Sequence, residues 1–462
     1  MELQKIETVV RKEGQIEIGG KQISYCFHYE KGTFADNTEI TSYAYTAEGE
    51  NRPLIFLTNG GPGSGVVWQH LGLFGPKRIH LDDDLNPQQC APFRLEDNPF
   101  CILDIADMVF IDPPGAGYSY LNPESMKEYA SVDKDAAAVA LYIELWRIEH
   151  RSANRPLYFM GESYGTVRGP ALLDTLYGGS EASTEKLMGI SPDGIILLGS
   201  CVTTSHFDQR QGQPVEQSVL NLECCAAAYA LHTGKDYRKA AEEAWEFTPE
   251  YAQALYMGNS LSDQKKKEIA DRLHELIGLD QKKLLKNHLK YGMFEFLQEA
   301  VPDKMIGFYD GRYLMDGTAK PQDKPHPGTT DVLADDPAMG KYTVAFMQGQ
   351  ELFAEEMDLP RKPYNFINAA VNKAWDRHNQ RTTIHSLENA QRRNNEMRIM
   401  FASGLFDMCT VPGGVRYVVN QSDLDMKRVF IGEYPSGHMA YLGDESAALL
   451  VGDIRKFLKK EI

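Results

Sequence analysis

The sequence lacks the cysteine patterns of a disulfide framework or of a zinc domain. Its seven cysteines are odd in number and scattered, and no two of them have C-x-x-C spacing. Cys224 and Cys225 are adjacent, so this pair cannot link distant segments. These observations exclude a disulfide-rich scaffold and a cysteine-based zinc site. We therefore predict that the cysteines are buried free thiols.

The sequence is also poor in long apolar runs and in positive charge. No stretch approaches the roughly 18 consecutive apolar residues of a membrane-spanning helix, and residues 1–20 lack the apolar region of a signal peptide. The 48 lysine and arginine residues are outnumbered by 65 aspartate and glutamate residues, which gives a formal net charge of −17. This composition argues against nucleic acids and membranes as partners. The sequence leaves the oligomeric state open.

A nucleophile elbow is present at residues 161–165, with the sequence Gly-Glu-Ser-Tyr-Gly. The apolar residues 156–160 before it indicate a buried strand, and residues 166–176 after it indicate a helix. A serine on so sharp a strand-to-helix turn has an exposed hydroxyl, and the flanking glycines let the strand and the helix approach each other closely. This setting makes Ser163 the candidate nucleophile.

Two further candidates follow in the chain order of α/β-hydrolase catalytic triads. Asp407 comes soon after the apolar run 399–402, and His438 follows the strand-like residues 429–432. Both fall just past strand ends, where that fold gathers its catalytic groups. Serine becomes a nucleophile when an imidazole takes its proton, and a carboxylate fixes the tautomer of that imidazole. We therefore predict a triad of Ser163, Asp407 and His438.

A glycine-rich turn upstream completes the predicted site. Residues 58–65 (Thr-Asn-Gly-Gly-Pro-Gly-Ser-Gly) follow an apolar strand at 54–57 and match neither of the common glycine-rich phosphate-binding motifs. Such a turn offers a backbone N–H to the oxyanion of a tetrahedral intermediate, beside the N–H of the residue after the nucleophile. The expected donors to the oxyanion are Gly61 and Tyr164.

Together these blocks resemble the signature sequences of the serine carboxypeptidases. The resemblance is carried by Asn-Gly-Gly-Pro-Gly-Ser at 59–64, Asp-Pro-Pro-Gly-Ala-Gly-Tyr-Ser-Tyr at 112–120, the elbow, Gly-His-Met at 437–439 and, more loosely, residues 371–376. It implies that Asn59 and Glu162 bind the free carboxylate of a peptide C-terminus. It also implies that Met439 and Thr410 line the pocket for the leaving residue.

Glu162 is the residue whose role needs a special charge state. A carboxyl group beside the nucleophile binds another carboxylate only when it is protonated, which requires burial or a second acid to raise its pKa. Members of the resembled family carry such a second acid shortly after the Gly-Gly turn, but this chain has no Asp or Glu between Asn59 and Asp82. The sequence leaves open how Glu162 is kept protonated.

The order of elements along the chain predicts the architecture. Alternating strands and helices indicate an α/β-hydrolase fold, with a mostly parallel central sheet and helices on both faces. Residues 1 to about 50 read as short antiparallel strands. We expect a core formed by residues 1–205 and 361–462, with a mainly helical cap inserted at residues 206–360.

Individual helix ends are also marked in the sequence. Ser131 is expected to cap a helix, and a second helix, in the cap, is bounded by Ser262 and Gly278. A loop rich in proline, glycine and aspartate is expected from Asp316 to Pro337.

The predicted function is that of a serine carboxypeptidase, which releases C-terminal residues from peptides through an acyl-enzyme and uses no metal ion or cofactor. The missing second acid keeps an esterase or an acyltransferase with the same triad as an alternative. A non-catalytic binding protein on the same scaffold is the third possibility. Eukaryotic members of the resembled family are typically secretory or vacuolar and disulfide-bonded, so this chain looks instead like a cytoplasmic member of prokaryotic type.

Overall fold

A nine-stranded sheet lies at the centre of the protein in this computed structural model, which describes residues 1–178, 183–184, 186–202, 217–317, 336–377 and 383–462. The strand order is β1 (Leu3–Ile18), β2 (Lys21–Phe34), β3 (Glu39–Ala47), β7 (Asp107–Asp112), β4 (Leu54–Thr58), β8 (Leu157–Glu162), β9 (Gly194–Leu198), β12 (Arg398–Gly404) and β13 (Val429–Tyr434). The strands from β7 to β13 run parallel to one another. The mostly parallel sheet predicted from the sequence is therefore present.

The antiparallel edge of the sheet is larger than the short strands that the sequence predicted. β1, β2 and β3 pair antiparallel, and β3 pairs antiparallel with β7. Gly19 and Gly20 join β1 to β2 with φ values of 56° and 76°, the left-handed conformation that a two-residue hairpin turn requires. Exposed residues recur along β1, so its apolar residues form no continuous run that would reveal the strand's full length.

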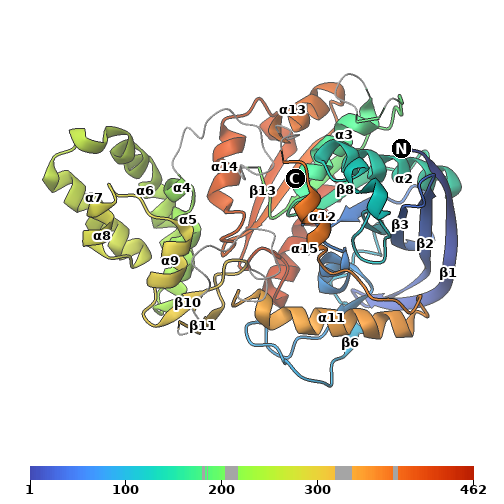
Figure 1. Cartoon of the computed structure of the whole chain (residues 1–462), viewed down its shortest axis with the longest axis horizontal. Helices are drawn as coiled ribbons and strands as arrows, with labels where there is room; N and C mark the ends of the chain where they lie inside the picture. The colour runs from blue at the N-terminus through green and yellow to red at the C-terminus, as the bar shows by residue number, and fades with distance from the viewer. Residues whose placement is uncertain (179–182, 185, 203–216, 318–335, 378–382) are drawn as a thin grey trace.

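Helices cover both faces of the sheet because successive residues of a strand point to opposite sides. In β4, Leu54 and Phe56 lie in one apolar core, whereas Ile55 and Leu57 lie in the other. The first core packs against α2 (Val132–Glu149), α3 (Gly165–Tyr177), α13 (Thr383–Arg393) and α14 (Pro412–Asn420). The second packs against α1 (Val67–Gln69), the π-helix η1 (His70–Phe74), α11 (Met339–Glu356) and α15 (Asp444–Leu458). In Figure 1, α2 and α3 accordingly lie across the sheet from α11.

The capped helices begin where the sequence predicted. The hydroxyl of Ser131 accepts a hydrogen bond from the backbone N–H of Lys134, 3.4 Å away, at the start of α2. Ser262 caps α7 (Asp263–Ile277) in the same way. That helix ends at Gly278, which has a left-handed φ of 76°.

A second lobe, mainly helical, has an apolar core of its own and lies beside the sheet in Figure 1. It contains α4 (Gln217–Leu220), α5 (Leu222–His232), α6 (Tyr237–Met257), the 3-10 helix η3 (Gly258–Ser260), α7, α8 (Gln281–Lys286), α9 (Met293–Glu299), β10 (Lys304–Ile306) and β11 (Leu314–Asp316). Phe406 and Met408 also belong to this core, so the lobe packs on the loop that carries Asp407.

Helix α11 falls within the predicted cap segment but packs against the sheet. The domain boundaries at residues 206 and 360 stay a prediction. Most of the expected loop from Asp316 to Pro337 lies outside the described residues. The remaining short elements are β5 (Lys77–Ile79), β6 (Leu95–Asp97), the 3-10 helices η2 (Pro123–Glu128) and η4 (Met426–Arg428), and α12 (Ala369–Ala374).

All seven cysteines are free thiols, as predicted, but three of them are not buried. Cys90 is exposed, and Cys26 and Cys409 are partly exposed. The prediction of burial is therefore wrong for these three, because single cysteines carry too little periodicity to place them. In the described part of the chain, no helix combines the length and apolar character needed to cross a membrane.

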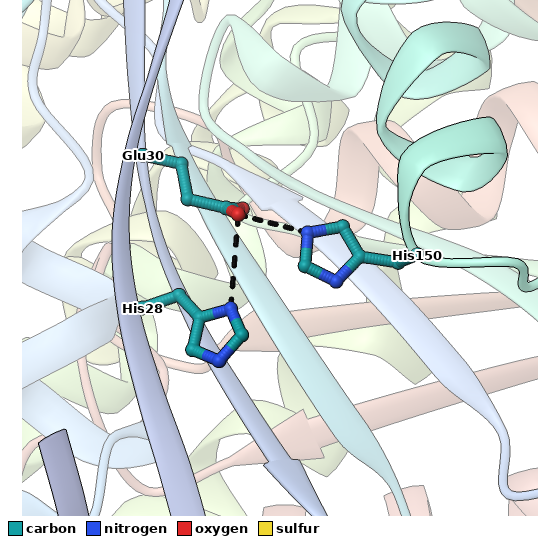
Figure 2. Close-up of side chains that lie close together, drawn as sticks. All are labelled: His28, Glu30 and His150. Carbon is teal, nitrogen blue, oxygen red and sulfur yellow. Dashed lines mark hydrogen bonds and ion pairs between the residues drawn. The ribbon is translucent and has the colours of Figure 1, made fainter. Parts of the chain in front are cut away.

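A buried carboxylate ties the antiparallel edge of the sheet to α2. Figure 2 shows Glu30 of β2 between His28 of the same strand and His150, which follows α2. Nε2 of His150 lies 2.8 Å from Glu30 and Nδ1 of His28 lies 3.7 Å from it. The indole N–H of Trp146 donates to the second oxygen of Glu30 at 2.6 Å. Burial alone would raise the pKa of Glu30, but these partners outweigh it and lower the pKa to about 2.

Candidate active site

Ser163 stands at the turn between β8 and α3, as the elbow motif predicted. Its φ of 57° is left-handed, a strained conformation for a residue with a side chain. The turn closes so tightly that a Cβ on Gly161 would lie 2.2 Å from the carbonyl oxygen of Gly165. The backbone N–H of Ser163 donates to Leu198 of β9 at 2.9 Å, which holds the turn on the sheet.

Asp407 and His438 come together beyond the ends of β12 and β13. Nδ1 of His438 lies 2.9 Å from Oδ2 of Asp407, and both side chains are buried. The backbone N–H groups of Cys409 and Thr410 donate to Oδ1 of Asp407, each at 2.8 Å. Burial lowers the pKa of His438, but the charge of Asp407 and its hydrogen bond outweigh that effect, so the pKa stands above its ordinary value.

One cavity brings most of the predicted site residues together. Its lining includes Ser163 and His438 with Asn59, Gly61, Glu162 and Met439. The other lining residues are mainly apolar or aromatic: Ser64, Trp68, Tyr309, Met339, Tyr342 and Ile367. The cavity thus places the serine–histidine pair, a glycine turn and a buried carboxyl group against an apolar wall.

The glycine-rich turn after β4 lies directly against the elbow. A Cβ on Gly60 would lie 2.6 Å from both the Cβ of Ser163 and the backbone nitrogen of Tyr164. Gly61 has a φ of 100°, a region that favours glycine. Only residues without side chains fit here, so Gly61 and Tyr164 lie on two segments that meet at the nucleophile.

A buried ion pair holds the nucleophile elbow against the glycine-rich turn. Nε of Arg168 on α3 donates to Asp135 on α2 at 2.6 Å, and Nη1 donates to the carbonyl oxygen of Asn59 at 2.6 Å. The hydroxyl of Tyr164 donates to the same Asp135 oxygen at 3.0 Å. Arg168 is 1% exposed, so these bonds form where water does not compete with them.

Glu162 is buried beside the nucleophile. Burial raises its pKa to about 7, and the neighbouring His438 and Tyr441 offset part of that rise. The hydroxyl of Tyr441 donates to Oε2 of Glu162 at 2.9 Å. Asn59 lies next to Glu162 and influences its pKa, but Nδ2 of Asn59 is buried and makes no well-formed hydrogen bond among the described residues. A carboxylate ligand would supply the acceptor that this amide lacks.

The structure gives Thr410 a different place from the predicted leaving-residue pocket. Met439 lines the cavity, but Thr410 does not. Its hydroxyl donates to Oδ2 of Asp407 and lies 3.1 Å from Nδ1 of His438. Thr410 follows Asp407 closely in the chain, and the bend at residues 408–410, just before α14, brings its hydroxyl back to the carboxylate. It therefore supports the Asp407–His438 pair.

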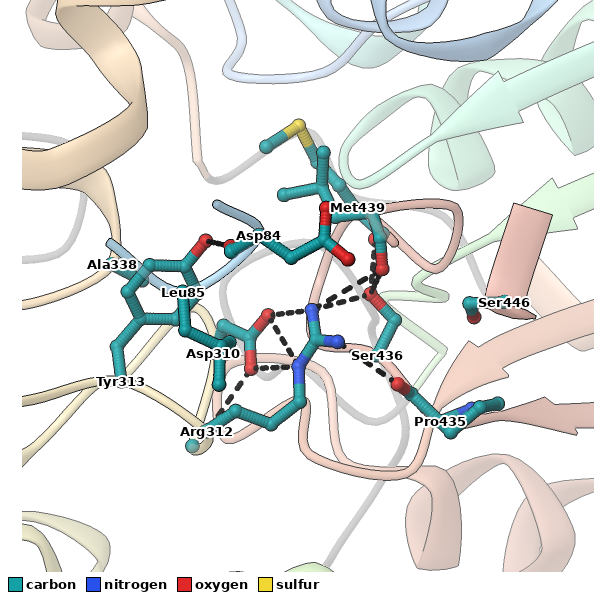
Figure 3. Close-up of polar contacts among 12 residues, drawn as sticks. Asp84, Leu85, Asp310, Arg312, Tyr313, Ala338, Pro435, Ser436, Met439 and Ser446 are labelled. Carbon is teal, nitrogen blue, oxygen red and sulfur yellow. Dashed lines mark hydrogen bonds and ion pairs between the residues drawn. The ribbon is translucent and has the colours of Figure 1, made fainter. Parts of the chain in front are cut away.

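Sequence reasoning missed the residues that hold the His438 loop from the other lobe. The backbone N–H of His438 donates to the carbonyl oxygen of Tyr309 at 2.7 Å, and the Tyr309 ring packs edge-on to the imidazole. Arg312 reaches the same loop, where it donates to the carbonyl oxygen of Pro435 at 3.0 Å and to the hydroxyl of Ser436 at 2.9 Å (Figure 3). Asp310 pairs with Arg312 at 2.6 Å. No local pattern in the sequence links these segments.

Two segments that lie far apart in the chain, one at Asp112 and one from Tyr364 to Asn372, support the glycine-rich turn. Buried Asp112 accepts hydrogen bonds from the backbone N–H of Val66 and the hydroxyl of Tyr364, both at 2.8 Å. Asn372 lies in α12, and its side chain donates to Pro62 at 3.5 Å. The block at 371–376 therefore acts on the site through the turn.

Comparison with known proteins identifies the family. The serine carboxypeptidase family model, Peptidase S10, matches residues 40–439. Serine carboxypeptidase-like 26 of Arabidopsis thaliana is 30% identical over 131 residues, which cover 28% of this chain and 27% of that protein. Serine carboxypeptidase-like 51 of the same plant is 26% identical over 204 residues, which cover 42% of this chain and 37% of that protein. The matched segments thus span only a quarter to just over a third of these relatives.

A solved structure shares the fold. The crystal structure of Kex1(delta)p, a prohormone-processing carboxypeptidase from Saccharomyces cerevisiae, superposes with a TM-score of 0.53 at 13% identity and covers 92% of this chain and 88% of that one. This likeness, with the sheet described above, confirms the α/β-hydrolase fold predicted from the sequence. Because the family model spans most of the sequence, the chain belongs to the serine carboxypeptidase family.

Proposed function

We propose that this protein is a serine carboxypeptidase that removes C-terminal residues from peptides through an acyl-enzyme intermediate. The observation that carries the proposal is the shared cavity, in which Ser163 and the Asp407-bound His438 stand beside Glu162 and Asn59. The first pair supplies acyl-transfer chemistry, and the second can hold a carboxylate. The C-terminus of a peptide presents a cleavable amide bond and a free carboxylate side by side, which matches these two pairs of residues.

The proposed reaction follows from this geometry. Oγ of Ser163 attacks the carbonyl carbon of the last peptide bond while Nε2 of His438 takes the hydroxyl proton. Asp407 accepts from Nδ1 of His438, which leaves Nε2 free as the base and stabilises the imidazolium. The N–H groups of Gly61 and Tyr164 would donate to the oxyanion. His438 then protonates the departing amino acid, and water attacks the resulting ester by the same steps.

Glu162 and Asn59 would select free C-termini. A protonated Glu162 donates a hydrogen bond to the substrate carboxylate, and the Asn59 amide supplies a second donor. Because the pKa of Glu162 is about 7, the group becomes anionic as the pH rises through that value and then repels the substrate. At the acid end His438 becomes protonated and can no longer act as the base.

The nucleophile is tested with a fluorophosphonate probe, which labels activated serines. We expect wild-type protein to be labelled and Ser163→Ala to lose both labelling and turnover by several orders of magnitude, because triad members act as a unit. Ser152→Ala is the matched control, since Ser152 is buried just after α2 and its hydroxyl donates to the carbonyl oxygen of Arg147 in the last turn of that helix. Labelling of Ser163→Ala equal to wild type would exclude the mechanism, and no labelling of wild type would favour a binding protein.

Substrate class is tested with matched peptides that end in a free acid or in an amide. We expect the ratio of kcat/KM for acid over amide to fall as the pH rises through about 7, where Glu162 ionises. Glu162→Gln keeps a neutral donor, so its ratio should be flat across that range. Parallel profiles for both substrates, unchanged in Glu162→Gln, would instead favour the esterase or acyltransferase that the missing second acid left open.

We also propose that the protein works in the cytoplasm. Its seven free cysteines suit a reducing compartment, where thiols stay unpaired. Cell fractionation with an antibody to the chain tests this, and recovery with exported proteins would contradict it.

A further inference from the structure

We propose that Tyr441 is a positioning residue that orients the Glu162 carboxyl group and so sets specificity for free C-termini. Its hydroxyl holds one oxygen of the Glu162 carboxyl as an acceptor, so that the proton sits on the other oxygen and is available to the substrate carboxylate. This inference rests on the carboxypeptidase function proposed above.

The contact itself is specific. The hydroxyl of Tyr441 donates to Oε2 of Glu162 at 2.9 Å, and it is the one well-formed hydrogen bond of that carboxyl group in the described part of the chain. Tyr441 is 2% exposed and Glu162 is 2% exposed. A hydrogen bond between two such groups is shielded from water and fixes the carboxyl plane.

The packing explains why no acid stands near this point of the chain. The segment after the glycine turn runs through α1 and η1 without an Asp or Glu. It carries Gly72, where a Cβ would lie 2.6 Å from Cε2 of Tyr441. The Tyr441 ring therefore occupies the space that a side chain at position 72 would need. Glycine at 72 and tyrosine at 441 are complementary.

A tyrosine and an acid would not do the same thing to Glu162. Burial raises the pKa of Tyr441 well above its ordinary value, so its hydroxyl stays protonated where Glu162 titrates. A donor to Oε2 leaves the carboxyl proton on Oε1. A second carboxyl group could share that proton with Glu162, whereas the Tyr441 hydroxyl donates to Oε2, and this bond favours the ionised form of Glu162.

The other charged and titratable groups around this pair are few. His438 and Asp407 act on Glu162 by their charges, from the loops after β13 and β12. Tyr342 of α11 is the further titratable group that acts on Tyr441. Neither Asp407 nor Tyr342 bonds to Glu162, so the Tyr441 hydroxyl is the contact whose removal isolates the effect.

The test is Tyr441→Phe, which keeps the ring against Gly72 and removes only the hydroxyl. Loss of a donor that favours the carboxylate raises the pKa of Glu162, so the midpoint of the acid-over-amide ratio should move up by roughly one pH unit. Loss of the anchor frees the carboxyl to rotate, so KM for free-acid peptides at low pH should rise about tenfold while kcat changes less. A purely structural tyrosine would lower kcat/KM for acids and amides alike and leave the midpoint unchanged.

Tyr142→Phe is the matched control. Tyr142 is fully buried, and its hydroxyl bonds to Ser42 at 2.8 Å in the core on the opposite face of the sheet. The control should leave both the midpoint and the acid-over-amide ratio at their wild-type values.

A second measurement separates this inference from the proposed function. Infrared difference spectra recorded across a pH titration follow the C=O stretch of the protonated Glu162 carboxyl, with Glu162→Gln as the blank. We expect Tyr441→Phe to move that midpoint upward, whatever the substrate preference. If wild type shows no preference for free acids, the proposed function fails. If wild type prefers free acids but Tyr441→Phe leaves both midpoints in place, only the role of Tyr441 is overturned.

Discussion

Asp407 accepts four hydrogen bonds, from the backbone of Cys409 and Thr410, from the Thr410 hydroxyl and from His438. Together these donors fix the orientation of the carboxylate. The carboxylate in turn selects the tautomer of His438 in which Nε2 is unprotonated. At the scale of the residue, His438, the proposed base, is therefore oriented by Asp407 and by the groups that bond to Asp407.

This arrangement predicts a measurable role for Thr410. Thr410→Val removes the hydroxyl donor but keeps both backbone donors, so Asp407 loses only part of its orientation. We expect kcat to fall roughly tenfold with KM nearly unchanged, because the group acts on His438 and not on the substrate. Thr248→Val in the helical lobe, where the hydroxyl bonds to Ala244 at 2.9 Å, is the control. A change in KM alone would contradict this role.

At the scale of elements, the site lies where two lobes meet. The segment between β10 and β11 carries Tyr309, Asp310 and Arg312, and all three touch the loop of His438. A Cβ on Gly437 would lie 2.4 Å from Asp310, so the loop and the segment fit only with glycine there. The helical lobe thereby holds the loop that carries His438.

Arg312 provides the test of this link. Arg312→Lys keeps the charge that pairs with Asp310 but cannot bond to Pro435 and Ser436 at the same time, because an ammonium lacks the planar fork of donors. We expect kcat to fall by about 10- to 100-fold for esters and peptides equally, since His438 serves both. Arg238→Lys, at a surface pair with Glu445, should have no effect. A loss confined to peptides would mean that Arg312 acts on substrate binding instead.

At the scale of the whole molecule, the Glu30 network predicts how stability depends on pH. Its pKa of about 2 in the folded protein lies below that of an unfolded glutamate, so its contribution is present above about pH 4.5 and is lost as the pH falls toward 2. The shift corresponds to a contribution on the order of 3 kcal/mol to the free energy of unfolding. Glu30→Gln should remove this contribution.

Denaturant unfolding at a series of pH values measures the contribution of Glu30 to the free energy of unfolding. The difference between wild type and Glu30→Gln should shrink as the pH falls from about 5 toward 2, with Glu17→Gln, on the exposed face of β1, close to wild type throughout. A difference that does not change with pH would show that packing, and not charge, explains the effect of Glu30.

The local signals in the sequence were reliable wherever a few neighbouring residues decide the structure. The elbow at Ser163, the cap at Ser131 and the end of α7 at Gly278 each depend on backbone conformation within one turn, which side-chain type controls directly. The apolar runs likewise placed the parallel strands, because all of them except the edge strand β13 are buried on both faces. Ser163, Asp407 and His438 also lie beyond the ends of β8, β12 and β13, as the sequence predicted, and their catalytic roles stay a prediction.

Contacts between distant segments were decided only when the chain folded. Thr410 bonds to the triad and not to the leaving-residue pocket, Arg312 reaches His438 from the other lobe, and Tyr441 takes the space above Gly72. Arg312 bonds to a residue 124 positions away, and the Thr410 hydroxyl meets His438 28 positions later in the chain. Local sequence does not encode such pairings, because they form only when the segments pack together. Local motifs thus indicate the proposed reaction. The charge state and orientation of the side chains in the site depend on the tertiary structure.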